Sequence, residues 1–196
     1  MRPIVLASTS SYRRTLLRQI GLPHQAHASG LDEAPFHAQE ADPRRLSEIL
    51  AEAKAKALCE RFPDALILGS DQVAALGEMI LHKPVTVERA CAQLRAMSGR
   101  ALQLWTAVSL VDAQSGETHT YTSLHTLKMR TLREDQIRRY VERDQPLDCA
   151  GSFKIESEGI ALFESIEGED YTAIIGLPLM AVVSLLERFG LFYPWE

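Results

Sequence analysis

The sequence has few cysteines, and those few are widely separated. Cys59, Cys91 and Cys149 are odd in number and form no Cys-x-x-Cys pair. They therefore predict neither a disulfide framework nor a cysteine metal site, and reduced thiols are the simpler interpretation. No apolar run approaches membrane-spanning length, and the run at the N-terminus is too short for a signal peptide. We expect a cytoplasmic protein that does not associate with a membrane.

An excess of basic residues is also missing. Lys and Arg number 21 against 26 Asp and Glu, which gives a formal net charge of -5. Proteins that bind nucleic acid over a broad surface usually carry a basic stripe that displaces counterions from the phosphates. We therefore expect no nucleic-acid partner, whereas a small anionic ligand needs only a local basic pocket.

Familiar motifs of nucleotide and metal chemistry do not occur either. The sequence contains neither GxxxxGK[ST], the phosphate loop of P-loop enzymes, nor GxGxxG, the dinucleotide-binding turn. The six histidines show no HExxH spacing. A phosphate site in this chain must therefore be built differently.

What the sequence does contain is enough apolar residues for a substantial core. Hydrophobic residues make up 46% of the 196 residues, and the length fits one domain over 1–196 with room for two lobes. Apolar runs and alternation predict strands at 4–7 and 65–69 and two long strands between 102 and 129 joined at 114–116. Helix starts are expected after 8–11, at Asp42, at Thr86, at Thr131 with Glu134 as a capping box, and at Pro178. This order predicts an α/β protein with a mixed sheet.

Hydroxyl groups and two arginines surround the start of the first predicted helix. Ser8, Thr9 and Ser10 precede Arg13 and Arg14. Hydroxyls, free backbone amides and guanidinium groups at a helix N-terminus suit a phosphate. Neighbouring helical residues point about 100° apart, so at most one arginine points fully into such a pocket. A solvated arginine pair after an ordinary capped turn fits the pattern equally well.

Acidic residues occur at two candidate points. Asp71 follows the apolar run 65–69, and we expect it at the carboxyl end of that strand, where open α/β sheets usually bind ligands. There it can orient a water or hold a divalent cation, or it can merely cap a turn. Asp32 and Glu33 lie in a predicted loop, and separated carboxylates are the usual protein ligands of magnesium. A solvated loop is the alternative for that pair.

Two lysines can neutralise the charge of a leaving pyrophosphate. Lys54 lies on the helix predicted after Asp42, and Lys83 precedes Pro84 in a loop. Most lysines are surface charges, and nothing intrinsic distinguishes these two from Lys56.

In order and spacing, these motifs together resemble the Maf family. The resemblance covers nearly the whole chain, and the joint occurrence of its short motifs is specific. The matching segments are Leu6 to Ser10, Arg13-Arg14, Asp32-Glu33, Lys54-Ala55, Gly69 to Val73, Lys83-Pro84, Ser98-Gly99, Thr106, Cys149 to Lys154 and Ile175 to Pro178. The resemblance implies a mixed β-sheet with flanking helices and two lobes around a nucleotide cleft, similar to inosine triphosphate pyrophosphatases. It also implies a homodimer and a divalent metal, normally Mg²⁺.

By matching position, the resemblance implies a nucleoside triphosphate pyrophosphatase and assigns roles to individual residues. Asp71 is the proton acceptor that activates water, and Glu33 together with Asp71 supports the metal or the water. The residues expected to bind the substrate phosphates are Ser8, Arg13, Arg14, Lys54 and Lys83.

Three positions bear on the choice of base: Tyr12, Gln72 and Glu156. Gln72 resembles the 7-methyl-GTP branch of the family, whereas the dTTP and UTP branch typically has Thr after the catalytic Asp. Methylation at N7 makes guanine cationic, and a cationic ring favours aromatic stacking and a nearby carboxylate, which Tyr12 and Glu156 can supply. The alternative is that Tyr12 packs on the first helix and Glu156 is solvated.

The resemblance therefore predicts hydrolysis of 7-methyl-GTP to 7-methyl-GMP and pyrophosphate, which removes modified nucleotides. One alternative is a dTTP or UTP pyrophosphatase of the same family. Another is a nucleotide-sensing regulator of cell division without important turnover. Loss of the catalytic acid or the lysines would mark such a regulator, yet Asp71, Lys54 and Lys83 are all present.

Overall fold

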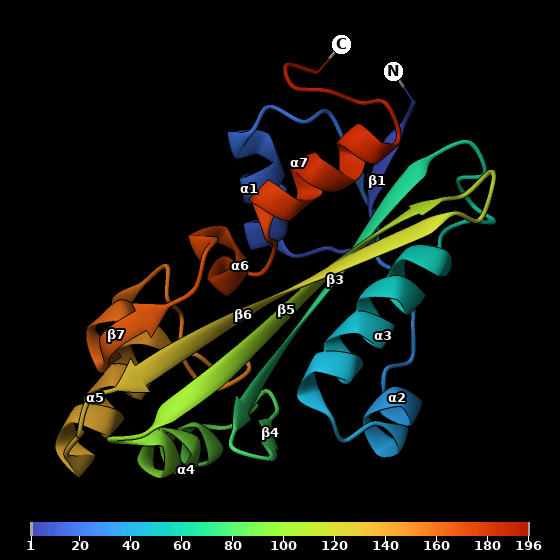
Figure 1. The fold of residues 1–196 in the computed structure, drawn as a ribbon. Helices are drawn as coiled ribbons and strands as arrows, with labels where there is room; N and C mark the ends of the chain where they lie inside the picture. The colour runs from blue at the N-terminus through green and yellow to red at the C-terminus, as the bar shows by residue number, and fades with distance from the viewer. Residues whose placement is uncertain (1, 196) are drawn as a thin grey trace. The chain divides into compact units, whose positions relative to one another are not determined.

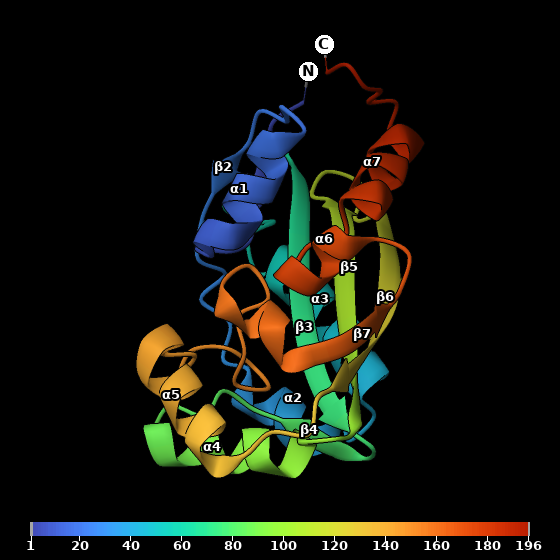
Figure 2. The ribbon, with the colours of Figure 1, turned by 90° about the vertical axis from the view of Figure 1, so that its left-hand side faces the viewer.

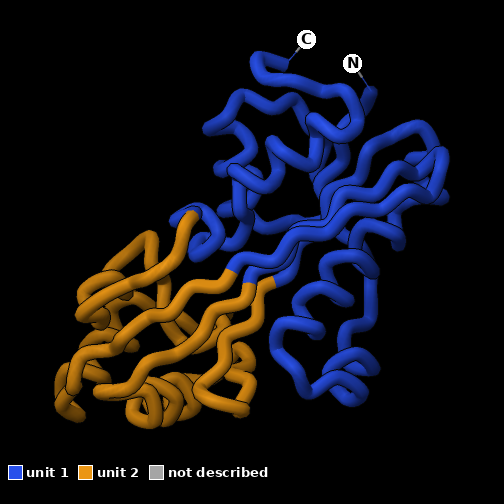
Figure 3. The backbone as a smooth tube through the Cα atoms, in the orientation of Figure 1, with its two compact units in different colours: residues 1–71, 106–123, 170–196 blue, residues 72–105, 124–169 orange. Residues whose placement is uncertain are grey.

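The computed structural model describes residues 2–195, which form two compact units (Figure 3). Of these residues, 2–71, 106–123 and 170–195 belong to the first unit, and 72–105 and 124–169 belong to the second. The chain passes from one unit to the other within strands β3 (Leu66–Leu76), β5 (Ala101–Asp112) and β6 (Thr118–Met129), and once more between Glu169 and Asp170. The expectation of one domain over 1–196 stays a prediction.

The strands of the described residues form one seven-stranded mixed sheet (Figure 1). Its order is β2-β1-β3-β5-β6-β7, and β4 pairs with β3 outside this path. β1 (Ile4–Leu6) runs parallel to β2 (Gln25–Ala26) and to β3. β4 (Met79–Leu81) is antiparallel to β3, and β7 (Phe163–Glu167) is antiparallel to β6. The predicted α/β class, a mixed sheet with flanking helices, is confirmed.

In the first unit, helices cover both faces of the sheet. Figure 1 shows α1 and α7 on one face and α3 on the other. The helices of this unit are α1 (Ser11–Gln19), α2 (Ala34–Gln39), α3 (Pro43–Lys56), α6 (Tyr171–Ile175) and α7 (Leu179–Arg188). None of the described helices is both long enough and apolar enough to cross a membrane.

The core of the first unit follows the two-residue alternation of its strands. Leu66 and Leu68 of β3 are buried in a cluster with residues of α1 and α7, whereas Ile67 is buried in a cluster with Ala55 of α3. Successive side chains of a strand point to opposite faces, so this pattern sets the direction of every later side chain on β3 while the strand stays regular. It therefore also decides which way the polar residues after Gly69 point.

The second unit contains helices α4 (Val87–Met97) and α5 (Glu134–Asp144) and a short 3₁₀ helix, η1 (Glu158–Leu162). Figure 2 shows α4 and α5 side by side. Arg95 on α4 and Glu134 on α5 form an exposed ion pair, with Nη2 2.7 Å from Oε1.

Most predicted helix starts agree with the structure because their caps are local. The side chains of Ser10, Asp42 and Thr86 accept hydrogen bonds from first-turn amides of α1, α3 and α4, and α7 begins directly after Pro178. The predicted capping box of Thr131 with Glu134 is wrong. α5 begins only at Glu134, because the amide of Leu132 donates to the Ser98 hydroxyl at 2.8 Å and holds this segment outside the helix.

The predicted end of the strand at 65–69 is also wrong. β3 continues to Leu76, because its residues 73–76 are buried and Ala74 to Leu76 pair with β4. Asp71 consequently lies within a strand and not at its carboxyl end. Glu33 lies in a loop as expected, at its last position, where it is the N-cap of α2. The helices α2 and α6 and the strand β7 were not predicted.

Candidate active site

Asp71 lies on β3 with its side chain toward α3. Ile67 packs in the core cluster on the α3 side, and Asp71, four residues later, lies on the same face. On α3, Lys54 lies in the last turn, and its Nζ is 2.6 Å from Oδ1 of Asp71. Both residues are only 8% exposed. The structure therefore places a predicted catalytic carboxylate and a predicted phosphate-binding lysine in direct contact.

Glu33 joins this pair from the start of α2. The Nζ of Lys54 lies 2.9 Å from Oε1 of Glu33, whose side chain is 42% exposed. One ammonium group thus joins two carboxylates that are far apart in sequence. We call Glu33, Lys54 and Asp71 the carboxylate–lysine group.

A glycine permits the close approach of β3 to α3 beside this group. A Cβ on Gly69 would lie 2.0 Å from the carbonyl oxygen of Ala51 and 2.8 Å from the amide nitrogen of Ala55. Only a residue without a side chain fits against the helix backbone here. Lys54 immediately precedes Ala55, so this contact holds the lysine against the strand that carries Asp71.

The surroundings of Asp71 shift its protonation. Burial raises the pKa of the Asp71 carboxyl above its ordinary value, the positive charges of Lys54 and Arg13 oppose that rise, and the charge of Glu33 adds to it. Burial also lowers the pKa of Arg13, against the attraction of Asp71 and Glu33. A carboxylate with a raised pKa accepts a proton more readily, which suits a general base.

Arg13 and Ser8, two predicted phosphate-binding residues, lie together at the start of α1. Nη1 of Arg13 donates to the Ser8 hydroxyl at 3.4 Å, and Nε donates to the carbonyl oxygen of Gly176 at 2.8 Å. The Ser70 hydroxyl donates to the same carbonyl at 3.0 Å. Ser70 lies on the face of β3 that packs against α1 and α7, because it continues the alternation of Leu66 and Leu68.

A family model described as Maf-like protein matches residues 3–189 of this chain. The chain belongs to the Maf family. Curated relatives match this chain over nearly their full length. A protein of Syntrophotalea carbinolica named 7-methyl-GTP pyrophosphatase is 46% identical and covers 97% of this chain and 96% of its own length. Proteins with the same name from Nitrosococcus oceani and Pseudomonas putida are 45% and 43% identical, covering 97% and 99% of this chain and 94% and 100% of their own.

Among solved structures, a HAM1 protein from Coxiella burnetii is similar to this chain at 17% identity. The alignment covers 83% of this chain and 91% of that one, with a TM-score of 0.44.

The remaining predicted residues of the first unit lie beside Arg13 on α1. Arg14 is half-buried, and within residues 2–195 its Nε is buried without a hydrogen-bond partner. Tyr12 is 36% exposed. Arg13 is held by Ser8 and Gly176, and the expectation that at most one of the two arginines points fully into a phosphate pocket stays a prediction.

The other predicted residues belong to the second unit. Lys83 is exposed in the loop after β4, Gln72 is half-buried on β3, and Glu156 is exposed in a turn before η1. Their roles in substrate binding and base choice stay predictions.

The carboxylate–lysine group is chemically suited to a divalent cation. Within the described residues, no three or more His, Cys, Asp or Glu side chains gather as a metal site. Mg²⁺, however, usually takes only one or two protein carboxylates and completes its shell with waters and substrate phosphates. Glu33 and Asp71 already converge on one cationic group, so these residues fit such an ion.

Two contributors to the site were absent from the predicted site residues. The carbonyl of Gly176 accepts from Arg13, and the Ser70 hydroxyl donates to that carbonyl. Both residues lie within segments that match the family motifs. A backbone carbonyl has no side-chain signature, so only the structure identifies it as an acceptor.

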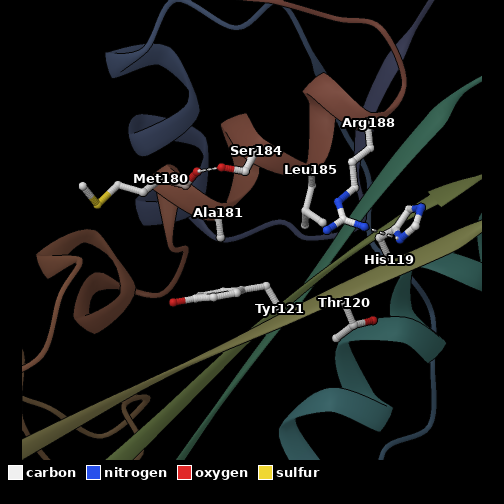
Figure 4. A pocket seen from close by; sticks show the side chains of 8 residues that line it. All are labelled: His119, Thr120, Tyr121, Met180, Ala181, Ser184, Leu185 and Arg188. Carbon is white, nitrogen blue, oxygen red and sulfur yellow. Dashed lines mark hydrogen bonds between the residues drawn. The ribbon is translucent and has the colours of Figure 1, made fainter.

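A separate pocket of about 310 Å³ lies between α7 and β6 in the first unit (Figure 4). Within it, Nη1 of Arg188 lies 3.3 Å from Nδ1 of His119. The residues that line it are His119, Thr120, Tyr121, Met180, Ala181, Ser184, Leu185 and Arg188. It contains none of the residues predicted to bind the nucleotide.

Proposed function

We propose that this protein hydrolyses 7-methyl-GTP to 7-methyl-GMP and pyrophosphate. The observation that carries the proposal is the carboxylate–lysine group, in which the buried Asp71 contacts Lys54 at 2.6 Å. The relatives named above, 43–46% identical over nearly their whole length, carry the name of this activity.

In the proposed mechanism, Asp71 accepts a proton from a water as that water attacks the α-phosphorus. A bond forms between the water oxygen and phosphorus, and the bond to the pyrophosphate oxygen breaks. The proton passes to Asp71, and the electron pair of the broken bond leaves with pyrophosphate. The raised pKa of Asp71 supports its role as the base.

The phosphates are bound by groups at the start of α1. Arg13 is oriented by Ser8 and Gly176, and Arg14 offers a buried Nε without a partner in the described chain. Charge neutralisation dominates phosphoryl transfer, so these guanidinium groups and Lys54 stabilise the negative charge that develops in the transition state. Lys83 is assigned to the same task from its position in the family motif.

A divalent cation, most simply Mg²⁺, belongs to this proposal. Glu33 and Asp71 would hold it. When bound, it would screen the phosphate charges and favour departure of pyrophosphate.

Base choice is assigned to Tyr12, Gln72 and Glu156 by their positions in the family motifs. A ring stacked on a cationic base and a carboxylate near its charge both favour 7-methylguanine over an uncharged base. A homodimer and a cytoplasmic location complete the proposal, and both rest on the family resemblance.

The proposal is tested by measuring monophosphate and pyrophosphate release from 7-methyl-GTP, GTP, UTP, dTTP and ITP with Mg²⁺. We expect 7-methyl-GTP to be preferred and Asp71→Asn to lower kcat by about 10²- to 10⁴-fold, the usual contribution of a general base. Asp64→Asn is the matched control, since this exposed carboxylate precedes β3 outside the group.

Other results would change the conclusion in specific ways. A preference for UTP or dTTP would retain the mechanism and move the protein to the pyrimidine branch. Turnover that survives Asp71→Asn would overturn the role of Asp71. Tight nucleotide binding without turnover would instead favour the nucleotide-sensing regulator.

A further inference from the structure

Two buried side chains, Asp170 and Thr172, cap two successive helices at once. Asp170 is 6% exposed, and its Oδ1 accepts from the backbone amide of Thr172 at 2.9 Å and from the Thr172 hydroxyl. Its Oδ2 accepts from the amide of Met180, also at 2.9 Å. The Thr172 hydroxyl in turn accepts from the amide of Leu179 at 2.9 Å. The first turns of α6 and α7 are therefore tied to each other.

A carboxylate suits this double cap better than a neutral capping group. Both of its oxygens are acceptors, so one serves α6 and the other serves α7. Asp170 makes no ion pair in the described part of the chain, and its carboxylate accepts instead from two backbone amides and the Thr172 hydroxyl at the helix N-termini. A buried carboxylate that lacked these donors would be strongly unfavourable.

The turn held between the two helices carries the acceptor of Arg13. α6 ends at Ile175, and Gly176 has a φ of +127°, a conformation that side-chain-bearing residues rarely adopt. The carbonyl of Gly176 accepts from Nε of Arg13 at 2.8 Å and from the Ser70 hydroxyl at 3.0 Å. Its position therefore decides where the Arg13 guanidinium lies.

The guanidinium is planar, so fixing one edge fixes the direction of the remaining donors. Nε is held by Gly176, and Nη1 also contacts Ser8 at 3.4 Å. A shift of the turn would rotate this plane and misdirect the donors toward the phosphates. Misplacement of a binding group by about 1 Å can lower the rate about 100-fold.

We propose that Asp170, together with Thr172, is a positioning residue that orients Arg13 through the α6–α7 turn. The inference rests on the proposed nucleotide hydrolysis, because Arg13 is the group proposed to bind the substrate phosphates. The side chain of Asp170 accepts hydrogen bonds from Thr172 and Met180 and not from Arg13 or Lys54, so its effect on Arg13 passes through the Gly176 carbonyl.

The test compares the hydrolysis of 7-methyl-GTP by Asp170→Asn, Thr172→Val and Thr172→Ser. Asn presents a donor where the carboxylate presents its second acceptor, and Val removes the hydroxyl at nearly constant volume, so we expect each to lower kcat/KM by about 10- to 100-fold. Thr172→Ser keeps the hydroxyl and should stay within about threefold of the wild type. Asp42→Ala, which removes the side-chain cap of α3 alone, controls for loss of a helix cap and should leave kcat/KM unchanged.

A second comparison separates positioning from general weakening of the fold. In an Arg13→Lys background, Asp170→Asn should lower kcat/KM by less than about twofold, because the side chain it orients is already lost. An undiminished effect in that background would overturn the proposal, as would equal activities of Thr172→Val and Thr172→Ser. If Asp170→Asn does not fold, the Thr172 pair carries the same comparison.

The wild-type assay is read first, so that the two proposals can fail separately. Turnover by the wild type with no effect of the cap variants overturns the positioning role alone. Binding of 7-methyl-GTP without turnover overturns the proposed hydrolysis, and the same variants are then compared by nucleotide Kd. If the effects of Asp170→Asn and Arg13→Lys on that Kd are additive, the positioning role is overturned as well. Absence of both turnover and binding overturns both proposals.

Discussion

The ammonium group of Lys54 lies 2.6 Å from Oδ1 of Asp71 and 2.9 Å from Oε1 of Glu33. A lysine at the end of α3 thus sets the charge balance around a buried carboxylate of β3. Removing one partner of a buried ion pair leaves the other charge uncompensated, which is more costly than the pair itself. Substitutions of Lys54 and of Glu33 should therefore move the pKa of Asp71 in opposite directions.

Lys54→Met should shift the acidic limb of the kcat/KM profile to higher pH. The charge of Lys54 opposes the rise that burial causes in the pKa of Asp71, so its removal raises that pKa further. Asp71 must be deprotonated to accept a proton, and activity at pH 7 should fall by at least about 10-fold. The measurement is kcat/KM from pH 5 to 9. Lys56→Met is the control, because Lys56 lies two residues away and pairs with Glu52 at the surface.

Glu33→Gln should shift the same limb to lower pH. The negative charge of Glu33 raises the pKa of Asp71, so a neutral side chain lowers it and keeps the base deprotonated in more acidic solution. The pH at half-maximal kcat/KM reports this shift independently of any loss in maximal rate. Glu60→Gln, an exposed acid outside the group, should leave the limb in place. A shift to higher pH would contradict the assigned geometry.

Gly69→Ala should severely destabilise the protein. The new Cβ would meet the Ala51 carbonyl at 2.0 Å, and a helix backbone cannot move aside as a flexible side chain can. We expect a loss of about 3 kcal/mol or more in the free energy of unfolding, measured in urea. Gly21→Ala is the comparison, because its site is open and its φ of +64° leaves only backbone strain of about 1–2 kcal/mol. Equal losses would show that β3 does not pack so closely on α3.

Asp112 should make stability sensitive to acid. Arg2 binds it through two nitrogens, Nη2 at 2.6 Å from Oδ1 and Nη1 at 2.9 Å from Oδ2, and this hydrogen bonding holds the pKa of Asp112 well below its usual range. A depressed folded-state pKa stabilises the protein above the unfolded value of about 3.9, and this contribution is lost as pH falls below that value toward the folded pKa.

Asp112→Asn should therefore lower the free energy of unfolding by about 1–2 kcal/mol at pH 7, allowing for the partial exposure of Arg2. The difference from the wild type should shrink between about pH 4 and pH 2. Urea unfolding at several pH values measures it. Arg2→Gln should remove most of the same contribution, and a double variant that loses the full sum of both would argue against the pairing.

Local features of the sequence were enough for much of the secondary structure. The caps at Ser10, Asp42 and Thr86 act within three residues of the helix start, and the alternation along β3 sends neighbouring side chains to opposite faces. Short-range geometry determines both patterns, so they can be seen without a fold. The resemblance to the Maf family added the selection of Asp71 and Lys54, because their local sequence did not distinguish Asp71 from an Asp that caps a turn or Lys54 from an ordinary surface lysine.

Only the tertiary structure decided the length of β3 and the partners within the site. β3 continues past Asp71 because its later residues pair with β4, and Arg13 finds its acceptor 163 positions away at Gly176. Likewise, Glu33 and Asp71 meet at Lys54 because α2, α3 and β3 pack together. The sequence by itself determined which residues carry charge, hydroxyl or no side chain, and where local elements begin. Which of them meet depends on long-range packing, which leaves no signature in neighbouring residues.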